Sequence, residues 1–235
     1  MSYPISVAVL LCGAGVYDGS ECTEAVTTLV HLSRAGAEVK MFAPNKDQMH
    51  AIDHTTGNEH TTTRNSLVES ARIARGQVSP LDDLLENASH YDALVIPGGF
   101  GVAKNLCNYA VKGADGMEVD ALVESVIGEF VKFKRVIGFC CIAPVLAAKL
   151  IPGAMLTVGS DVQSDLYPYA GTAKDVETLG AKHVVCSHDE VVVDEKNLVV
   201  TAPAYMYAGK PHEIDDSTRE LVKSVLALVE KQRNR

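Results

Sequence analysis

The sequence predicts an α/β fold in which a mostly parallel β-sheet is covered by helices on both faces. Short, nearly continuous apolar runs recur along the chain, and segments with apolar residues at helical spacing lie between them. Strands buried on both faces have continuous apolar sequences, and alternation of strands with helices is typical of parallel sheets. The 235 residues are enough to bury a large core, and this length fits one large α/β domain as easily as two small ones. We expect a single domain over 1–235 with an insert at about 44–80.

The individual elements are predicted from apolar periodicity and from residue types that stop helices. Ala25, Leu29 and Leu32, for example, share one face of a segment that ends before Gly36, and glycine is typical of the position just after a helix. Strands are expected at 5–11, 39–42, 94–96, 136–139 and 181–185, a hairpin joins 191–194 to 198–201, and helices are expected at 24–34, 119–133, 142–150, 169–179 and 214–231.

The polar stretch at 44–80 does not fit this alternation. It is longer than an ordinary connection between a strand and a helix. We expect an inserted hairpin and a short helix around 67–75. Three interpretations remain open for this insert: it covers the active site, it forms a subunit interface, or it is a surface elaboration without chemistry.

The charge of the chain excludes several classes of partner. The formal net charge is −9, and an acidic surface repels phosphate backbones, so we expect no nucleic-acid partner and no binding to anionic membranes. The longest apolar runs are far too short to span a bilayer. The first residues resemble neither an export nor a transit signal, which predicts a cytoplasmic protein; a processed chain from the mitochondrial matrix would look the same.

The cysteines are predicted to be reduced thiols. No two of them have C-x-x-C spacing, so neither a zinc site nor a thioredoxin-type motif is predicted, and we expect no metal and no cofactor. A chain of this length does not need disulfides to stabilise its core. The six cysteines are Cys12, Cys22, Cys107, Cys140, Cys141 and Cys186.

Three motifs follow predicted strands, and the first contains two adjacent cysteines. A strand ends at Phe139, Cys140 and Cys141 follow, and Pro144 lies near the start of the next helix. This is the layout of a nucleophile elbow, in which a strained turn exposes one side chain above the sheet. Backbone N–H groups at the helix start would stabilise a thiolate and lower its pKa. The pattern alone does not choose between the two cysteines, and it also allows that neither is reactive.

The second motif is the glycine-rich turn Pro97-Gly98-Gly99-Phe100-Gly101. Glycine lets a backbone turn tightly and approach a ligand closely, so these N–H groups could form an oxyanion hole that faces the cysteine. No Lys-Ser/Thr pair follows as a phosphate-binding loop requires. A plain tight turn is the alternative.

The third motif follows the first strand and combines glycines with carboxylates. Gly13 and Gly15 do not continue into a dinucleotide-binding fingerprint, which argues against a nicotinamide or flavin cofactor. Glu21 and Glu24 are three residues apart and can share a face of the first helix turn. Acidic residues there usually cap the helix. A glutamate aimed at the cysteine could instead hold the proton that the thiol gives up.

Together these motifs resemble the DJ/PfpI superfamily, the class I glutamine amidotransferase-like fold, and within it the branch of ElbB, the enhancing-lycopene-biosynthesis protein described as a glyoxalase. The resemblance covers almost the whole chain, and the Gly-Gly-Phe-Gly and Cys-Ile-Ala-Pro segments are its most specific parts. It implies a flavodoxin-like three-layer αβα sandwich and, by analogy, a homodimer. The similar segments lie at 15–21, 31–37, 63–65, 97–106, 138–144 and 201–206.

The resemblance also assigns the site residues. The family's nucleophile is followed two residues later by a small residue and then by proline, which selects Cys141, and the family's helix-start glutamate falls on Glu24. Gly98, Gly99 and Ile142 match the positions that supply backbone donors to an oxyanion.

One departure from the family changes the expected chemistry. Many members keep a histidine near the cysteine, either just after it or at the end of a later strand. In this sequence Ile142 occupies the first position, and 158–161, which correspond to the second, contain no histidine. His183 and His188 do not match either position. A Cys-His-Glu triad for amide hydrolysis is therefore not expected. The resemblance instead implies a glyoxalase-type lyase: Cys141 adds to glyoxal or a related small aldehyde or dicarbonyl, and Glu24 moves the proton.

Two other functions are compatible with the sequence. Cys141 could be a redox sensor whose oxidation alters a partner interface. Alternatively, the chain could be an amidotransferase-like subunit linked to isoprenoid biosynthesis, with a histidine such as His54 recruited from the insert.

Overall fold

The structure, a computed structural model, describes residues 3–234 and contains within them a seven-stranded and a two-stranded sheet. The strands are β1 (Ser6–Leu10), β2 (Glu38–Ala43), β3 (Val78–Pro80), β4 (Ala93–Ile96), β5 (Val136–Cys140), β6 (Met155–Leu156), β7 (Lys182–His183), β8 (Val192–Asp194) and β9 (Val199–Ala202). The main sheet has the order β3-β2-β1-β4-β5-β9-β8, and all neighbours are parallel except the β8–β9 hairpin. The predicted α/β class with a mostly parallel sheet is confirmed.

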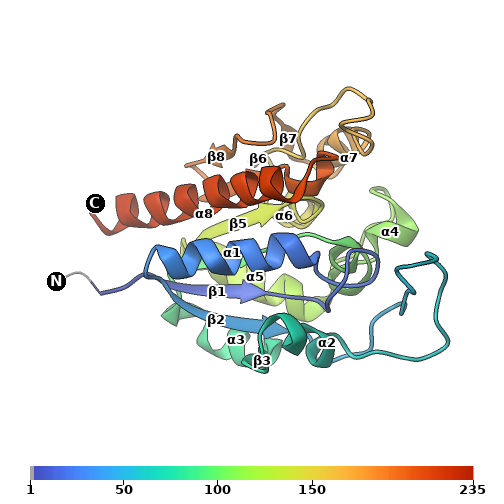
Figure 1. Cartoon of the computed structure of the whole chain (residues 1–235). Helices are drawn as coiled ribbons and strands as arrows, with labels where there is room; N and C mark the ends of the chain where they lie inside the picture. Colours follow the sequence, from blue (N-terminus) through green and yellow to red (C-terminus); the bar gives the residue numbers. More distant parts are fainter. Residues whose placement is uncertain (1–2, 235) are drawn as a thin grey trace.

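Helices cover both faces of this sheet and complete the three layers. They are α1 (Cys22–Arg34), α2 (Ser66–Ile73), α3 (Leu81–Asn87), α4 (Tyr109–Lys112), α5 (Ala121–Lys132), α6 (Pro144–Leu150), α7 (Thr172–Thr178), α8 (Pro211–Arg233), the 3-10 turns η1 (Ala88–His90) and η3 (Ala204–Met206), and the π-helical turn η2 (Val102–Leu106). On one face α1 packs against α8, and on the other α3 packs against α5 (Figure 1). In the described part of the chain, no helix has the length and apolar character needed to cross a membrane.

The contact between α1 and α8 combines apolar packing with polar pairs. His31 Nε2 lies 2.8 Å from Asp215 Oδ1, and the hydroxyls of Thr27 and Thr218 are 2.8 Å apart. Buried polar groups must find partners, and these pairs satisfy the two buried ones, His31 and Thr218, across the interface. The contact holds the first turn of α1 in place relative to the end of β9.

The stretch at 44–80 differs from the predicted insert in one respect. Two antiparallel bridges, Asp47 to Asn65 and Ile52 to Glu59, join its two arms where a hairpin was expected, and α2 is the expected short helix. The last three residues, however, form β3 and pair in parallel with β2. Because this strand is only three residues long and contains a serine and a proline, no apolar run marks it in the sequence. The excursion from the sheet therefore ends before Val78.

The strand order reverses between β1 and β4. The chain moves from β1 outward to β2 and β3, then returns to the other side of β1 to form β4 and β5. In open parallel sheets, ligands bind at the carboxyl ends of the strands beside such a reversal. The segments that leave these ends are 11–21, 97–101 and 141–143, and the long loop after β2 extends beyond the same end (Figure 1).

A buried carboxylate links the small β6–β7 sheet to the β8–β9 hairpin of the main sheet. Asp194 is 2% exposed and accepts hydrogen bonds from Met155 N at 2.8 Å, from the Asn197 side-chain amide at 2.7 Å, and from the backbone N–H groups of Lys196 and Asn197 at 3.1 Å. One side chain thus closes the β8–β9 turn and joins it to β6.

We predict that Asp194→Ala destabilises the fold by about 3 kcal/mol, because several N–H groups lose a charged acceptor. The measurement is urea unfolding followed by circular dichroism. Glu195→Ala is the matched control: this neighbouring carboxylate is exposed and pairs with Lys231 on the surface, so its loss should change stability little. Equal losses in the two variants would contradict the assignment.

Candidate active site

Cys141 lies on a sharp turn between β5 and α6. Its φ of 58° is in the left-handed region, which costs a non-glycine residue roughly 1–2 kcal/mol. Its N–H donates to Ala202 O at 3.1 Å, and Pro144 begins α6 three residues later. This is the geometry of the predicted elbow. The turn also separates the two cysteines, since Cys140 is fully buried whereas Cys141 is 8% exposed and lines a cavity.

Glu24 lies in the first turn of α1, directly behind this thiol. The side chain is fully buried, and Oε2 accepts from Gly98 N at 2.9 Å while Oε1 accepts from Tyr205 N at 3.0 Å. Cys140 Sγ donates to Oε2 at 3.8 Å, and the Cys141 thiol lies beside the same carboxyl group. Burial, assisted by the charge of Glu21, raises the pKa of Glu24 to about 7, although these hydrogen bonds lower it in part.

The thiol of Cys141 is protonated in the resting site. Burial first, and then the charge of Glu24, raise its pKa well above the ordinary value. Hydrogen bonds from Gly99 N and Ile142 N act in the opposite direction. The prediction that the helix start would lower this pKa is therefore wrong, because desolvation and a buried carboxylate outweigh two backbone donors. A thiol of this kind needs a base at the moment it attacks.

Gly98 and Gly99 have different places in the site. A Cβ on Gly98 would overlap the Cβ of Cys141 and lie 2.7 Å from Glu24 Oε2. Any larger residue at position 98 would therefore clash with both, and only glycine leaves room for the thiol and the carboxylate to lie close together. The N–H of Gly98 is already paired with Glu24. Of the three predicted oxyanion donors, only Gly99 and Ile142 direct their N–H groups at the sulfur, whereas Gly98 positions the carboxylate.

Glu21 is a further site residue, and it has the capping role that the sequence analysis considered for the acidic residues at this helix start. Its side chain caps α1, with Oε2 accepting from Glu24 N at 2.8 Å, and it also lines the cavity. Burial raises its pKa. The two glutamates are therefore not alternatives: Glu24 lies behind the thiol, and Glu21 lies on the cavity side.

The cavity above Cys141 has a volume of about 540 Å³. Its walls come from loops after β1 and β4, from α4, and from the segments that precede α7 and follow β9. In the described part of the chain its lining contains one charged side chain, that of Glu21, and is otherwise mainly apolar and aromatic. The aromatic and thioether lining consists of Tyr17, Phe100, Tyr109, Tyr169, Tyr205 and Met206.

No histidine lines this cavity within residues 3–234. His183 Nε2 accepts from Val158 N at 3.2 Å, and His188 stacks on Tyr207 with ring centroids 4.5 Å apart. His54 Nε2 accepts from Tyr17 N at 3.2 Å, and the two rings lie 4.9 Å apart. The insert thus supports a wall of the cavity through His54. The same residues contain no group of three or more metal-ligating side chains.

Comparison with known proteins identifies the family. Residues 7–208 match the model of the DJ-1/PfpI family, which covers most of the chain. The chain belongs to the DJ-1/PfpI family. Residues 7–208 include the elbow, both glycines and both glutamates described above.

Named relatives extend this result. The chain is 52% identical to a rat protein called "ES1 protein homolog, mitochondrial" and 51% identical to the human "Glutamine amidotransferase-like class 1 domain-containing protein 3, mitochondrial", with 96% of this chain and 84% of each relative covered. An isoprenoid biosynthesis protein with an amidotransferase-like domain from Ehrlichia chaffeensis is 32% identical, with a TM-score of 0.85 over 95% of this chain and 99% of that one. Drosophila melanogaster DJ-1beta shares the fold at 18% identity and a TM-score of 0.54, covering 98% of each chain.

The raised pKa of Glu24 predicts how stability depends on pH. The ordinary pKa of a glutamate is 4.5, and that of Glu24 in the folded protein is about 7. Between these two pH values the folded state keeps a proton on Glu24 that the unfolded state has released. Stability therefore falls as pH rises through this window, by up to about 3 kcal/mol. Glu24→Gln should remove that slope, whatever its absolute stability. Urea unfolding at several pH values measures the slope of unfolding free energy against pH. Glu86→Gln, at an exposed position, is the control and should keep the wild-type slope.

Proposed function

We propose that this protein is a cofactor-independent, glyoxalase-type lyase that converts glyoxal or a related dicarbonyl into a hydroxy acid. The observation that carries the proposal is a thiol that lines a cavity and lies beside a buried carboxyl group whose pKa is raised to about 7. A general base is most effective when its pKa lies near the working pH. Cys141 and Glu24 form such a pair without a histidine.

The reaction follows from these positions. The Cys141 sulfur adds to the aldehyde carbon as its proton passes to Glu24, and Gly99 N–H and Ile142 N–H stabilise the developing oxyanion. Glu24 returns this proton to the oxygen, which gives a thiohemiacetal and leaves Glu24 ionised. Glu24 then moves the proton from the first carbon to the second, while the hydroxyl proton passes from the first oxygen to the second, so that the first carbon is oxidised to a thioester and the second is reduced to an alcohol. Water cleaves the thioester, which releases the hydroxy acid and regenerates the thiol.

The geometry favours this function over the two alternatives. A redox sensor needs a readily ionised thiol, and the pKa of Cys141 is raised instead. Glutamine hydrolysis usually relies on a histidine, and the described cavity lining has none and no basic side chain to pair with a substrate carboxylate. The names of the human and Ehrlichia relatives mention amidotransferase-like domains, which describes a fold they share with this chain.

The proposal includes a compartment. The rat and human relatives are named as mitochondrial proteins. We extend that location to this protein in place of the cytoplasm, and a reducing matrix would keep Cys141 as a thiol.

The direct test is the formation of glycolate from glyoxal. We expect Cys141→Ser to lower kcat/KM at least about a hundredfold, since removal of a nucleophile costs several orders of magnitude in enzymes that depend on one. Cys186→Ser, a partly buried cysteine that does not line the cavity, is the matched control and should retain wild-type activity. Equal rates for wild type and Cys141→Ser would overturn the proposal.

The pH profile tests the base. Because Glu24 must be ionised to accept the thiol proton, kcat/KM should rise with pH through a midpoint near 7, the pKa of the buried carboxyl group. Glu24→Gln should abolish both the activity and this transition. A transition near pH 4.5, or a profile unchanged in Glu24→Gln, would show that another group is the base.

A further inference from the structure

The size of the cavity is out of proportion to glyoxal. Its volume of about 540 Å³ falls in the range of roughly 300–1,000 Å³ typical of sites that bind drug-sized ligands. A two-carbon dicarbonyl held at the Cys141 sulfur would occupy only the floor. The rest of the cavity, whose lining includes five aromatic side chains, is available to a substituent on the substrate.

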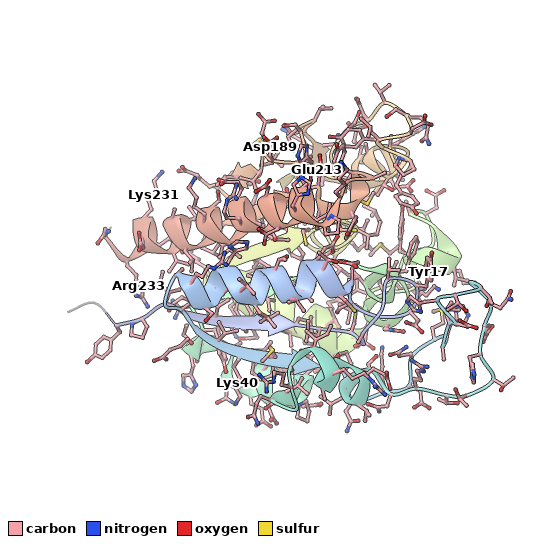
Figure 2. The ribbon with its side chains drawn as sticks, viewed as in Figure 1. Tyr17, Lys40, Asp189, Glu213, Lys231 and Arg233 are labelled. Atoms are coloured by element: carbon pink, nitrogen blue, oxygen red, sulfur yellow. The ribbon has the colours of Figure 1, made fainter. Side chains whose placement is uncertain are left out.

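Large aromatic side chains at this site are left half exposed. Tyr17 is 42% exposed and Tyr169 is 47% exposed, and both line the cavity. Tyr169 meets Phe100 edge to face, with centroids 6.1 Å apart and an interplanar angle of 79°. Figure 2 shows Tyr17 at the end of the molecule where the parallel strands finish. A ligand that covers these rings removes apolar surface from water and adds aromatic contacts.

The walls are held in place before any ligand binds. The backbone of Tyr17 is fixed at both ends, because its N–H donates to His54 Nε2 at 3.2 Å and its carbonyl accepts from Lys104 Nζ at 2.7 Å. The hydroxyl of Tyr109 is hydrogen-bonded to Asp175 of α7. A pre-formed site loses little conformational entropy on binding, which strengthens the case that these walls bind a ligand.

The charge of the lining restricts what the substituent can be. In the described part of the chain, Glu21 is its one charged side chain, and no lysine, arginine or histidine lines it. Lys104 approaches the Phe100 ring at 6.0 Å but lies outside the lining and donates to Tyr17. A phosphate or carboxylate on the substrate would be desolvated near a glutamate without a cation to pair with.

We propose that the substrates are neutral dicarbonyls with a bulky apolar substituent, aromatic by preference, and that Phe100, Tyr169 and Tyr17 bind that substituent. This inference rests on the proposed function and specifies its substrate class. Phenylglyoxal has the required form: the thiol adds to its aldehyde carbon, a proton moves from that carbon to the ketone carbon, and water releases mandelate. The aldehyde carbon is oxidised as the ketone carbon is reduced, so no external oxidant is needed.

The test compares three substrates in initial-rate assays, kept short because phenylglyoxal modifies arginines over time. We expect kcat/KM for phenylglyoxal to exceed that for glyoxal at least about tenfold, the scale on which apolar pockets discriminate. A phenylglyoxal bearing a ring carboxylate should lose most of that advantage. Each rate is taken as the difference between wild type and Cys141→Ser.

Tyr169→Ala separates binding of the substituent from the chemistry. It should lower kcat/KM for phenylglyoxal about tenfold more than kcat/KM for glyoxal, because only the larger substrate reaches the ring. Phe133→Ala is the matched control, since this aromatic ring is 42% exposed at the end of α5 and does not line the cavity. It should change neither rate.

The outcomes distinguish this inference from the proposed function. Cys141-dependent turnover of glyoxal with no preference for phenylglyoxal would overturn the substrate class and leave the function standing. A preference that survives Tyr169→Ala, Phe100→Ala and Tyr17→Ala alike would overturn the assigned binding residues. The absence of Cys141-dependent turnover of any dicarbonyl would overturn the proposed function, and the substrate class with it.

Discussion

The buried carboxylate of Glu24 is the interaction on which the rest of the site depends. It accepts one N–H from Gly98 after β4 and one from Tyr205 after β9, it accepts from the Cys140 thiol at the end of β5, and it lies beside the thiol of Cys141. Since Glu24 itself belongs to α1, a single side chain joins four segments that are distant in sequence. A fully buried carboxylate is tolerated only when it is hydrogen-bonded, and these partners also fix where the thiol can lie.

This arrangement sets the chemistry as well as the geometry. Burial raises the pKa values of both Glu24 and Cys141, so the site rests with a neutral thiol beside a carboxyl group that ionises near neutral pH. The pair differs from a thiolate–imidazolium pair, which is ionised before the substrate arrives. Here the nucleophile is generated as the proton leaves for Glu24, and two N–H groups face the place where negative charge develops.

The cavity adds selectivity to this centre. The reactive pair is supplied by α1 and the elbow, whereas the walls are supplied mainly by loops. His54 and Lys104 hydrogen-bond to the backbone of Tyr17 and hold one of these walls in place. The excursion after β2 therefore has a structural link to the site, which favours the first of its three predicted interpretations. Loops carried on a rigid parallel sheet are a common way for one fold to serve different substrates.

Local features of the chain were determined by the sequence itself. The apolar runs predicted the parallel sheet, and the elbow at Cys141 and the helix start at Glu24 could be recognised because turns, caps and periodicity depend on near neighbours in the chain. Family resemblance, rather than pattern, chose Cys141 over Cys140. The strands β3 and β6 and the helix α4 were missed, since segments of two to four residues show no apolar period, and the seven-residue helix α3 was missed as well.

The tertiary structure alone decided the rest. It paired the Gly98 N–H with Glu24, reversed the expected direction of the Cys141 pKa, gave Glu21 a place on the cavity side, and assembled aromatic walls from segments far apart in sequence. Desolvation and Coulomb interactions depend on which atoms surround a group in space, and sequence spacing does not contain that information for residues more than a hundred positions apart, as Glu24 and Cys141 are.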